Sequence, residues 1–291
     1  TIQAGINGAE EGDTVLVVAG TYYENIVWPE TVGIKLIGSD KENCIIDGGQ
    51  NGSVIRLVGA FYPFDDTTTL IKDFTIRNGY AQGDSPNNKG GGIYISFIHP
   101  NLTNVTISGN TAEYHGGGIY LEFSNPNLTN VTISENMAYV WGGGMYLQVA
   151  YPTMMNVTIS DNTAENDGGG MFVSDGRPSL TNVTISNNTV ENGEGGGILL
   201  FCCGATLKNT IIWDSPESIY LYPDVWPNEA PTITYSIIEG DTTWTGEGNL
   251  NIDPLFCDPD NGDFTLASNS PCVGTGQDGA NMGALGVGCA E

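Results

Sequence analysis

One unit of 26 residues is written four times between Gly90 and Leu200, and this repeat constrains the fold more than any other feature of the chain. The string NVTIS starts at Asn104, Asn130, Asn156 and Asn182. Glycine triplets keep nearly the same step, starting at Gly90, Gly116, Gly142, Gly168 and Gly195. A fixed period of roughly 20 to 50 residues is the signature of a solenoid built from stacked repeats.

The residues inside each period predict strands and turns. Ile119 and Leu121 flank Tyr120, and Val131 and Ile133 alternate with polar residues in the same way. Such alternation is typical of a half-buried strand, and glycine and asparagine mark the turns between strands. One repeat cannot bury its apolar side alone, so the coils must stack into a parallel β-helix. The residues expected in its buried columns are Val105, Ile107, Val131, Ile133, Val157, Ile159, Val183 and Ile185.

Asparagines that keep step with the repeat have a structural explanation. Asparagine tolerates the left-handed backbone conformation, and its amide can bond to the same amide one coil away. We expect a ladder of amides at Asn104, Asn130, Asn156, Asn182 and Asn209. A second set in step with the period is Asn110, Asn136, Asn162 and Asn188.

The charge of the chain limits its partners. The 291 residues include 34 acidic and 8 basic side chains, a formal net charge of −26. Such a surface disfavours nucleic acid and anionic membranes, and no apolar run reaches the roughly 18 residues of a membrane span. The composition fits an extracellular or cell-surface protein. The chain starts at Thr1 without a methionine or signal peptide, so we expect a processed or trimmed chain.

Six cysteines lack the CxxC spacing of a zinc site. Their even number in an acidic, extracellular chain favours disulfides, although fifteen pairings of six cysteines exist. The six are Cys44, Cys202, Cys203, Cys257, Cys272 and Cys289.

The chain divides into four stretches of one domain spanning residues 1–291. Residues 1–13 read as a short amphipathic helix that caps the solenoid, with Thr1 as its N-cap. Residues 14–89 form irregular coils, and residues 90–213 form the regular repeats. Residues 214–291 are loop-rich C-terminal coils and a cap, and four prolines between Asp214 and Pro231 predict a loop excursion there.

Several segments together resemble a known family. They are TIQAGINGAEEGDTVLVVAGTYYENI (1–26), NIDPLF (251–256), NGDFTL (261–266) and MGALG (282–286). With the middle repeats they resemble bacterial secreted right-handed parallel β-helix repeat proteins of the pectate-lyase-like superfamily. The repeats are also similar to polymorphic outer-membrane autotransporter passengers. The resemblance implies an all-β, right-handed, single-stranded helix with three sheets, and a fold that serves lyases, hydrolases, adhesins and structural proteins alike.

Catalysis on this scaffold needs specific side chains. A polysaccharide lyase needs a base and a cation that neutralises the uronate carboxylate, often with calcium. Lys72 and Arg77 are the best candidates, with Lys35 and Arg56 on nearby coils. A glycoside hydrolase needs two carboxylates about 5 to 9.5 Å apart, and the repeats offer no acidic pair. Isolated basic residues on strands are more often tied to acidic neighbours.

Aromatic residues are the candidates for binding. One outward position of successive coils carries Tyr94, Tyr120, Tyr146 and Phe172. As an exposed stripe, it would stack on sugar rings or pack against a partner. The alternative is that these rings stack on each other or lie under a loop. Beside them the variable residues before each glycine triplet form a candidate recognition rim, Tyr114, His115, Tyr139 and Trp141.

Two weaker patterns also suggest ligands. Outward Thr and Ser, from Thr106 to Ser186, form a hydroxyl grid like the threonine arrays of ice-binding solenoids. Threonine is also simply a good strand residue. The segment DPDNGD offers Asp258, Asp260 and Asp263 as a calcium loop, but a turn between two strands is the alternative.

From these patterns we expect a non-catalytic extracellular β-solenoid that acts as a surface, adhesive or structural assembly module and contacts glycans. It needs no cofactor, although calcium fits the acidic loop. The expected partners are other copies of the chain or an extracellular glycan, without nucleic acid or membrane insertion. The alternative is a polysaccharide lyase or glycoside hydrolase acting on extracellular glycans. An enzyme would show a groove with converging titratable groups, whereas a structural module would show flat faces.

Overall fold

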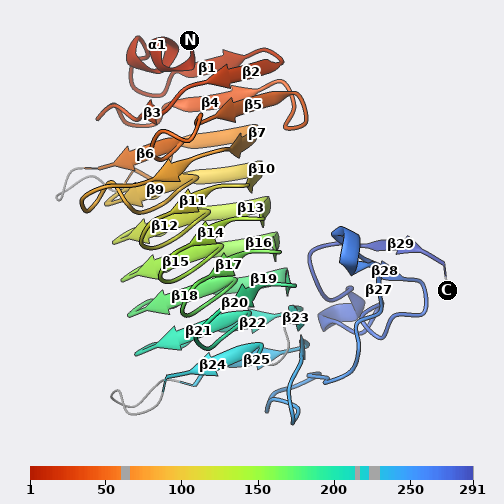
Figure 1. The fold of residues 1–291 in the computed structure, drawn as a ribbon. Coiled ribbons are helices and arrows are strands. Elements are labelled where there is room, and N and C mark those ends of the chain that lie inside the picture. Colours follow the sequence, from red (N-terminus) through yellow and green to blue (C-terminus); the bar gives the residue numbers. More distant parts are fainter. Residues whose placement is uncertain (60–65, 214–216, 223–229, 291) are drawn as a thin grey trace.

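The structure, a computed structural model, describes residues 1–59, 66–213, 217–222 and 230–290. The chain winds into a parallel β-solenoid with three sheets along its axis (Figure 1). This confirms the predicted all-β, right-handed, three-sheet parallel β-helix. Each repeat contributes one segment to each sheet in turn.

The three sheets are named A, B and C. Sheet A contains β1 (Thr14–Val17), β2 (Gly20–Tyr23), β4 (Lys35–Gly38), β5 (Cys44–Asp47), β7 (Leu70–Arg77), β10 (Asn101–Ser108), β13 (Asn127–Ser134), β16 (Thr153–Ser160), β19 (Ser179–Ser186), β22 (Thr206–Lys208), β23 (Ile211–Trp213), β25 (Thr232–Thr234) and β26 (Ile237–Ile238). Sheet B contains β3 (Ile26–Val27), β6 (Ile55–Val58), β9 (Ile93–Ser96), β12 (Ile119–Glu122), β15 (Met145–Gln148), β18 (Met171–Ser174), β21 (Ile198–Phe201) and β24 (Ile219–Leu221). Sheet C contains β8 (Tyr80–Ala81), β11 (Thr111–Ala112), β14 (Met137–Ala138), β17 (Thr163–Ala164) and β20 (Thr189–Val190).

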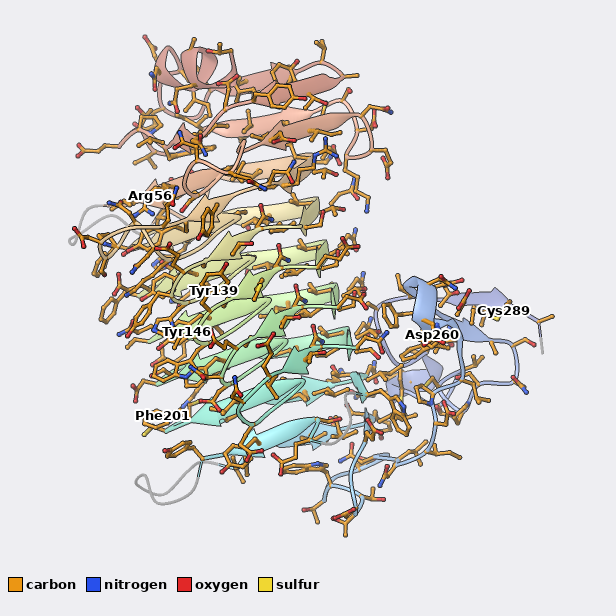
Figure 2. All side chains as sticks on the ribbon, viewed as in Figure 1. Arg56, Tyr139, Tyr146, Phe201, Asp260 and Cys289 are labelled. Atoms are coloured by element: carbon orange, nitrogen blue, oxygen red, sulfur yellow. A yellow bond between two sulfur atoms is a disulfide. The ribbon has the colours of Figure 1, made fainter. Side chains whose placement is uncertain are left out.

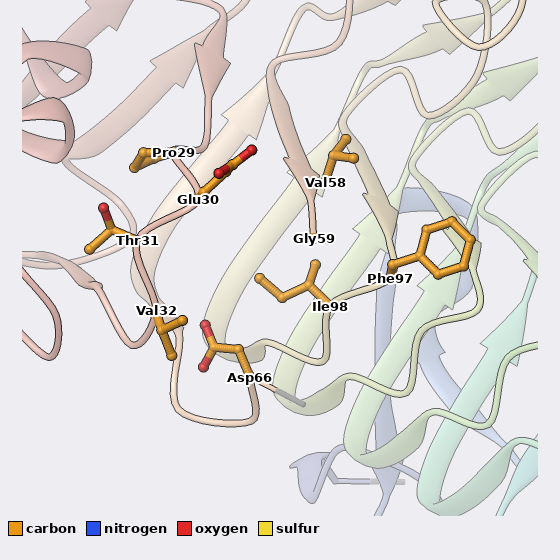
Figure 3. Close-up of a pocket in the computed structure, with 9 residues that line it drawn as sticks. All are labelled: Pro29, Glu30, Thr31, Val32, Val58, Gly59, Asp66, Phe97 and Ile98. Carbon is orange, nitrogen blue, oxygen red and sulfur yellow. The ribbon is translucent and has the colours of Figure 1, made fainter. Parts of the chain in front are cut away.

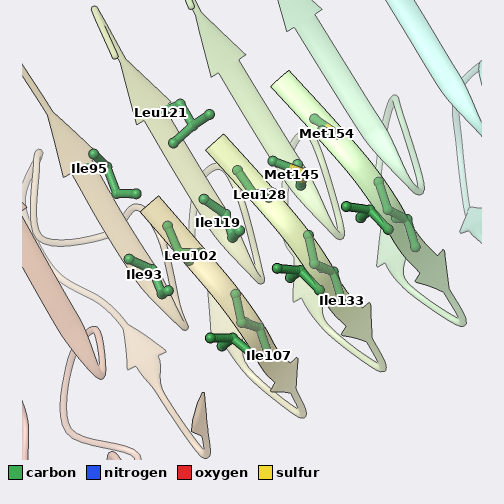
Figure 4. Packing of buried hydrophobic residues seen from close by; sticks show 14 of the residues in the cluster. Ile93, Ile95, Leu102, Ile107, Ile119, Leu121, Leu128, Ile133, Met145 and Met154 are labelled. Carbon is green, nitrogen blue, oxygen red and sulfur yellow. The ribbon is translucent and has the colours of Figure 1, made fainter. Parts of the chain in front are cut away.

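The core is a set of stacked aliphatic columns (Figure 4). Val105 pairs in register with Val131, and Ile107 with Ile133, so equal residues lie above one another. All eight residues predicted for these columns are buried, which confirms the 26-residue period. Removing such side chains from water supplies most of the stabilisation, at about 25 cal/mol per Å² of apolar surface.

The long strands of sheet A bend at an asparagine. Asn104 has a φ of +53° and Asn130 a φ of +54°, in the left-handed region that asparagine tolerates. The bend puts two outward residues in succession, so Leu102 and Val105 both point into the core. On the outer surface the amide of Asn156 donates to Asn130 Oδ1 at 3.1 Å, and that of Asn182 donates to Asn156 at 3.3 Å. These contacts confirm the predicted ladder for Asn130, Asn156 and Asn182. Its two end members bond elsewhere, since Asn104 Nδ2 donates to Asp73 Oδ1 at 2.6 Å and Asn209 Oδ1 accepts from Gln277 N at 2.8 Å.

A second ladder, at Asn110, Asn136, Asn162 and Asn188, lies inside the solenoid. Asn136 is 1% exposed, and both its backbone N–H and its Nδ2 donate to Asn162 Oδ1, at 3.0 and 2.9 Å. The same Nδ2 donates to Ile107 O at 2.9 Å. The buried polar groups of the turn are therefore satisfied by this column. Asn130 of the outer ladder, by contrast, is exposed.

The glycine triplets occupy the tight passage from sheet C to sheet B. Gly116 has a φ of +70°, where side chains are strained. A Cβ on Gly117 would lie 2.4 Å from Met137 O and 2.5 Å from Gly143 O. The chain passes so close to its neighbouring coil that only glycine fits.

A short helix caps the first coil. It is α1 (Ile2–Asn7), shorter than the predicted 1–13, and Thr1 is its N-cap as predicted. Ile2 and Ile6 are buried against the core, and the carboxylate of Glu24 accepts from the backbone N–H of Ile2 at 2.8 Å. Among the described residues no helix is long and apolar enough to span a membrane.

The C-terminal tail lies along the side of the solenoid, not across its end (Figure 1). It contains β27 (Phe256–Asp258), the 3₁₀ helices η1 (Pro259–Asn261) and η2 (Gln277–Gly279), β28 (Asp263–Ala267) and β29 (Val287–Cys289). The outward Thr and Ser column of sheet A changes to Ile211 and Ile237 at this place, and Leu266, Cys272 and Met282 of the tail bury them. The expected end cap is therefore a lateral brace.

Two further predictions for this half of the chain need correction. The loop predicted from Asp214 to Pro231 lies largely outside the described residues, but its described part forms β24, which pairs with β21. One disulfide joins Cys257 and Cys289 within the tail. The other four cysteines, which were expected to pair, are free: Cys44, Cys202, Cys203 and Cys272.

The first prediction concerns the core. Changing Ile133 to Asp buries a carboxyl group among aliphatic side chains, and we expect the free energy of unfolding to fall by more than about 4 kcal/mol. Urea denaturation followed by circular dichroism measures it. The adjacent outward change Thr132→Asp is the control and should have a much smaller effect. Equal losses would contradict the stacked-column description.

The second prediction compares the two ladders. Asn136→Ala removes the acceptor of the Asn110 amide and strands buried groups, so we expect a loss of about 1–3 kcal/mol in the free energy of unfolding. Asn130→Gly removes an exposed amide and keeps a residue that accepts positive φ, so its loss should be below about 0.5 kcal/mol. A larger loss for Asn130→Gly in the same urea titrations would show that the outer ladder dominates.

Candidate functional site

The aromatic column of sheet B faces away from the core but is not exposed. Tyr94, Tyr120, Tyr146 and Phe172 are each 5% exposed or less. Their rings stack along the axis, with centroids 5.3 Å apart between Tyr94 and Tyr120 and between Tyr120 and Tyr146. The expectation of an exposed stripe is wrong, and the alternative of rings stacked under a cover is confirmed. The equal spacing follows from strand stacking.

The cover comes from the segments that precede the glycine triplets. His115 stacks on Trp141 at 4.8 Å and on Tyr146 at 4.4 Å between ring centroids. Tyr114 lies against His115 at 3.8 Å in a tilted arrangement. Two of the predicted rim residues, His115 and Trp141, therefore belong to the packed layer over the column.

His115 is the most perturbed titratable group of this layer. It is 4% exposed, and its Nδ1 is buried without a hydrogen-bond partner among the described residues. Burial, with the nearby charge of Lys89, lowers the pKa of His115 to about 3. The imidazole is therefore neutral at physiological pH and packs as an aromatic ring.

Polar groups line the end of the column nearest the N-terminus. Tyr94 donates to Glu122 Oε2 at 3.2 Å, and Tyr120 donates to Gln148 Oε1 at 2.7 Å. Lys89 Nζ donates to the Tyr120 hydroxyl at 3.1 Å. These bonds form two groups at the edge of sheet B, Tyr94 with Glu122 and Tyr120 with Lys89 and Gln148. They fix the orientation of the rings rather than leaving them to rotate.

Two cations rest on these rings. The guanidinium of Arg56 lies 4.0 Å from the Tyr94 ring centroid, and Lys89 Nζ lies 4.8 Å from that of Tyr120. Burial lowers the pKa of both cations, against the raising effects of Tyr94 on Arg56 and Glu122 on Lys89. Burial, with Glu122, also raises the pKa of Tyr120, so the phenol stays protonated. Such cation–π contacts are worth about 0.5–2 kcal/mol each.

The basic residues proposed for lyase chemistry lie elsewhere, on sheet A. Lys72 Nζ lies 3.7 Å from Asp73 Oδ2, and Arg77 Nε lies 3.1 Å from Asp47 Oδ2. The structure thus ties both to acidic neighbours, and it does not bring them to Arg56, which is on sheet B. Lys35 Nζ donates to Gly12 O at 3.3 Å.

Exposed aromatic rings flank the packed column on both sides. Tyr114 and Tyr139, 41% and 39% exposed, precede β12 and β15, whereas Phe123 and Tyr151, 43% and 46% exposed, follow the same strands. We call these four residues the aromatic rims. Figure 2 shows Arg56, Tyr139 and Tyr146 on one side of the solenoid, opposite the tail that carries Asp260 and Cys289. Of the rims, Tyr139 therefore lies on a side of the solenoid that the tail leaves uncovered.

A small cavity of about 80 Å³ lies near the N-terminal end, beside Asp66 (Figure 3). Asp66 Oδ1 accepts from the backbone N–H groups of Thr68 and Thr69, and Oδ2 accepts from Gly33 N. Burial opposes ionisation of this carboxyl, but the hydrogen bonds from Thr69, Gly33 and Thr68 keep its pKa below the usual range. Its acceptor sites are occupied by the turn, so the carboxylate acts as a structural clamp.

The acidic loop of the tail forms a turn. Asp258 accepts from Asn261 Nδ2, and Asp263 accepts from the backbone N–H of Thr265 at 3.0 Å. Asp260 lies exposed in η1 between them. In the part of the chain that the structure describes, no group of three or more acidic, histidine or cysteine side chains is arranged to hold a metal ion. The strand–turn–strand alternative is the observed one.

The hydroxyl grid is partly covered. Thr158, Ser160, Thr184 and Ser186 are buried on the side where the tail lies. The Thr184 hydroxyl accepts from Ala284 N at 2.9 Å, and Asn187 Nδ2 donates to Pro259 O. These outward residues therefore serve as attachment points for the tail.

Sequence reasoning missed several residues of this face. Lys89 ends a loop, residues 82–89, that makes its coil five residues longer than the 26-residue period, and this extra length was a usable signal. Glu122, the partner of Tyr94, was not singled out. Phe123 and Tyr151 gave no signal, because their exposure depends on how the turns after sheet B fold.

A family model described as "Right handed beta helix region" matches residues 18–212 and, in a second match, residues 158–248. A search of curated proteins finds no match in sequence.

Among solved structures, the A-module of the Azotobacter vinelandii mannuronan C-5 epimerase AlgE4 is 15% identical, with a TM-score of 0.42 over 84% of this chain and 85% of that chain. A rice weevil pectin methyl esterase is 14% identical, with a TM-score of 0.40 over 82% and 73%. A carrot pectin methylesterase is 15% identical, with a TM-score of 0.39 over 84% and 78%. At this level the likeness concerns the β-helix fold alone.

The third prediction uses the low pKa of His115. The unfolded chain takes up a proton at His115 below pH about 6.5, whereas the folded chain does so only near pH 3, so stability falls as the pH is lowered. Between pH 7 and pH 5 this group should remove about 2 kcal/mol from the free energy of unfolding. His115→Phe keeps a flat ring and should lose correspondingly less over the same interval. Urea titrations at pH 7 and pH 5 measure the loss for each protein. If the unmodified chain and His115→Phe lose the same free energy of unfolding between these pH values, the low pKa of His115 is contradicted.

Proposed function

Because the chain belongs to the family of right-handed β-helix regions, we propose that it is a non-catalytic β-solenoid that contacts glycans outside the cell. Its role is that of a surface, adhesive or assembly module. The observation that carries this proposal is the pair of aromatic rims on the face of sheet B.

The rims have the chemistry of a sugar-binding surface. Aromatic rings stack against the apolar faces of sugar rings. The sugar hydroxyls point outward from the edge of the sugar ring and stay free for hydrogen bonds. Tyr114 and Phe123 lie before and after β12 on one coil, and Tyr139 and Tyr151 lie before and after β15 on the next coil, although neither pair is in step with the 26-residue period. Parallel pairing of β12 with β15 keeps those coils in register. A rigid scaffold with exposed rings binds with little loss of side-chain freedom.

The buried groups of the same face support binding over catalysis. Lys89, Glu122 and Tyr120 are engaged with one another or with neighbouring rings, and Tyr120 is 0% exposed. A general acid or base must reach the atom that it protonates or deprotonates. These groups hold the rings that support the rims, which is a positioning role.

The net charge and the disulfide both favour an extracellular location and extracellular partners. The net charge of −26 suits a solvated extracellular surface and opposes binding to nucleic acid. The disulfide between Cys257 and Cys289 is typical of an oxidising compartment. Extracellular glycans and further copies of the chain are therefore the partners that fit.

The fourth prediction tests the rims. A variant with serine at Tyr114, Phe123, Tyr139 and Tyr151 should bind glycans at least about tenfold more weakly, because it loses the stacking contacts. A glycan array selects the ligand, and calorimetry measures the dissociation constant. The control carries Leu16→Ser and Tyr23→Ser, which remove still more exposed apolar groups, 76% and 75% exposed, from the first coil.

The outcomes separate the function classes. If the rim variant and the control bind the glycan with equal dissociation constants, the rims are not the glycan-binding surface. Sedimentation velocity of both variants tests in the same way whether the rims mediate self-association. The rival reading is a polysaccharide lyase or glycoside hydrolase. Release of unsaturated or reducing ends from a polysaccharide, abolished by Lys89→Met, would establish that reading instead.

A further inference from the structure

A shallow hollow of about 250 Å³ lies where the chain passes from sheet A to sheet C. Its walls are Gln50, Tyr80, Thr111 and Tyr139, and its remaining lining is Gly79 and Gly109. These residues come from four separate coils or turns. Nothing in the repeat pattern brings them together except the stacking of the coils.

The backbone around the hollow is firmly held. Gly52 and Tyr80 exchange two backbone hydrogen bonds of 2.9 Å, and Gln50 N donates to Asn78 O at 2.7 Å. Thr111 N donates to Gly79 O at 2.9 Å. A Cβ on Gly79 would lie 1.9 Å from Gly91 O, so glycine is required on this side of the hollow. The site is preformed rather than assembled on binding.

The wall combines two phenol rings with hydrogen-bonding groups. Tyr80 donates to Glu113 Oε1 at 3.2 Å, and Gly83 N donates to Glu113 Oε2 at 2.9 Å. Burial and the Glu113 carboxylate raise the pKa of Tyr80, so its phenol remains a donor at neutral pH. The Gln50 amide and the Thr111 hydroxyl both donate and accept. Sugar hydroxyls have this same dual character.

We propose that this hollow is a subsite for one neutral hexose unit of the glycan that the rims contact. The proposal rests on the proposed function, since Tyr139 belongs both to a rim and to the hollow. The ring of Tyr139 stacks on the sugar, and Gln50 and Thr111 bond its hydroxyls. The volume is below the roughly 300–1,000 Å³ of sites that enclose a drug-sized ligand, so it accepts a single ring of a longer chain.

The electrostatics select a neutral sugar over an anionic one. Glu113 lies beside the hollow through its bond to Tyr80, and the nearby Arg77 is neutralised by Asp47 at 3.1 Å. The charge of −26 on the whole chain adds long-range repulsion of polyanions. A carboxylated sugar would therefore lose affinity relative to its neutral counterpart.

The experiment measures binding of cellohexaose, mannohexaose and hexagalacturonate to the full chain by calorimetry. We expect a neutral hexasaccharide to bind more tightly than hexagalacturonate, and Gln50→Ala with Thr111→Ala to weaken that binding about tenfold. Thr163→Ala is the matched control, because Thr163 occupies the same position of sheet C two coils further on. It should bind like the unmodified chain.

The possible results are distinguishable. If the rim variant loses binding but the Gln50 and Thr111 variant keeps it, the proposed function stands and the subsite is refuted. Tighter binding of hexagalacturonate, or equal losses in the Thr163 control, also overturns the subsite. If the unmodified chain binds none of the three probes and no glycan on the array, both proposals fall. A stability measurement on each variant confirms that it is folded.

Discussion

Strand pairing in exact register from one coil to the next is the constraint on which the rest of the structure depends. Because β10, β13, β16 and β19 pair residue for residue, any outward or inward position becomes a column along the axis. A column must be filled with side chains that tolerate their own kind as neighbours. Aliphatic residues, amides and aromatic rings meet this condition, and isolated charges do not. The inward columns accordingly hold aliphatic residues.

Much of the fold was predictable because the amino-acid sequence itself repeats with a fixed period of 26 residues. Alternation located the buried columns, and the step of Asn130 and Asn156 located a ladder. Sequence alone did not tell which ladder is buried, because the left-handed bend at Asn130 shifts the alternation by one residue. The lateral tail also escaped prediction. Its docking depends on Ile211 and Ile237, whose outward direction is apparent only once the sheet is formed.

The candidate site was harder to predict for a related reason. Alternation correctly gave Tyr120 and Tyr146 as outward residues, but outward is not the same as exposed when a neighbouring turn folds over the sheet. The cover is formed by His115 and Trp141, which stack only because their coils are in register. The exposed rings and the hollow lie on turns, where coil-to-coil variation is tolerated. The proposed contact residues thus lie where the repeat is least regular.

The axial direction of the strand hydrogen bonds gives the molecule a mechanical anisotropy. Force applied along the axis pulls on hydrogen bonds between successive coils, so coils would peel from an end one after another. Force applied across the axis instead loads the covalent chain of each coil. The disulfide between Cys257 and Cys289 closes a loop within the tail and does not join one coil to another. The rod should therefore resist a load from the side better than a load along its axis.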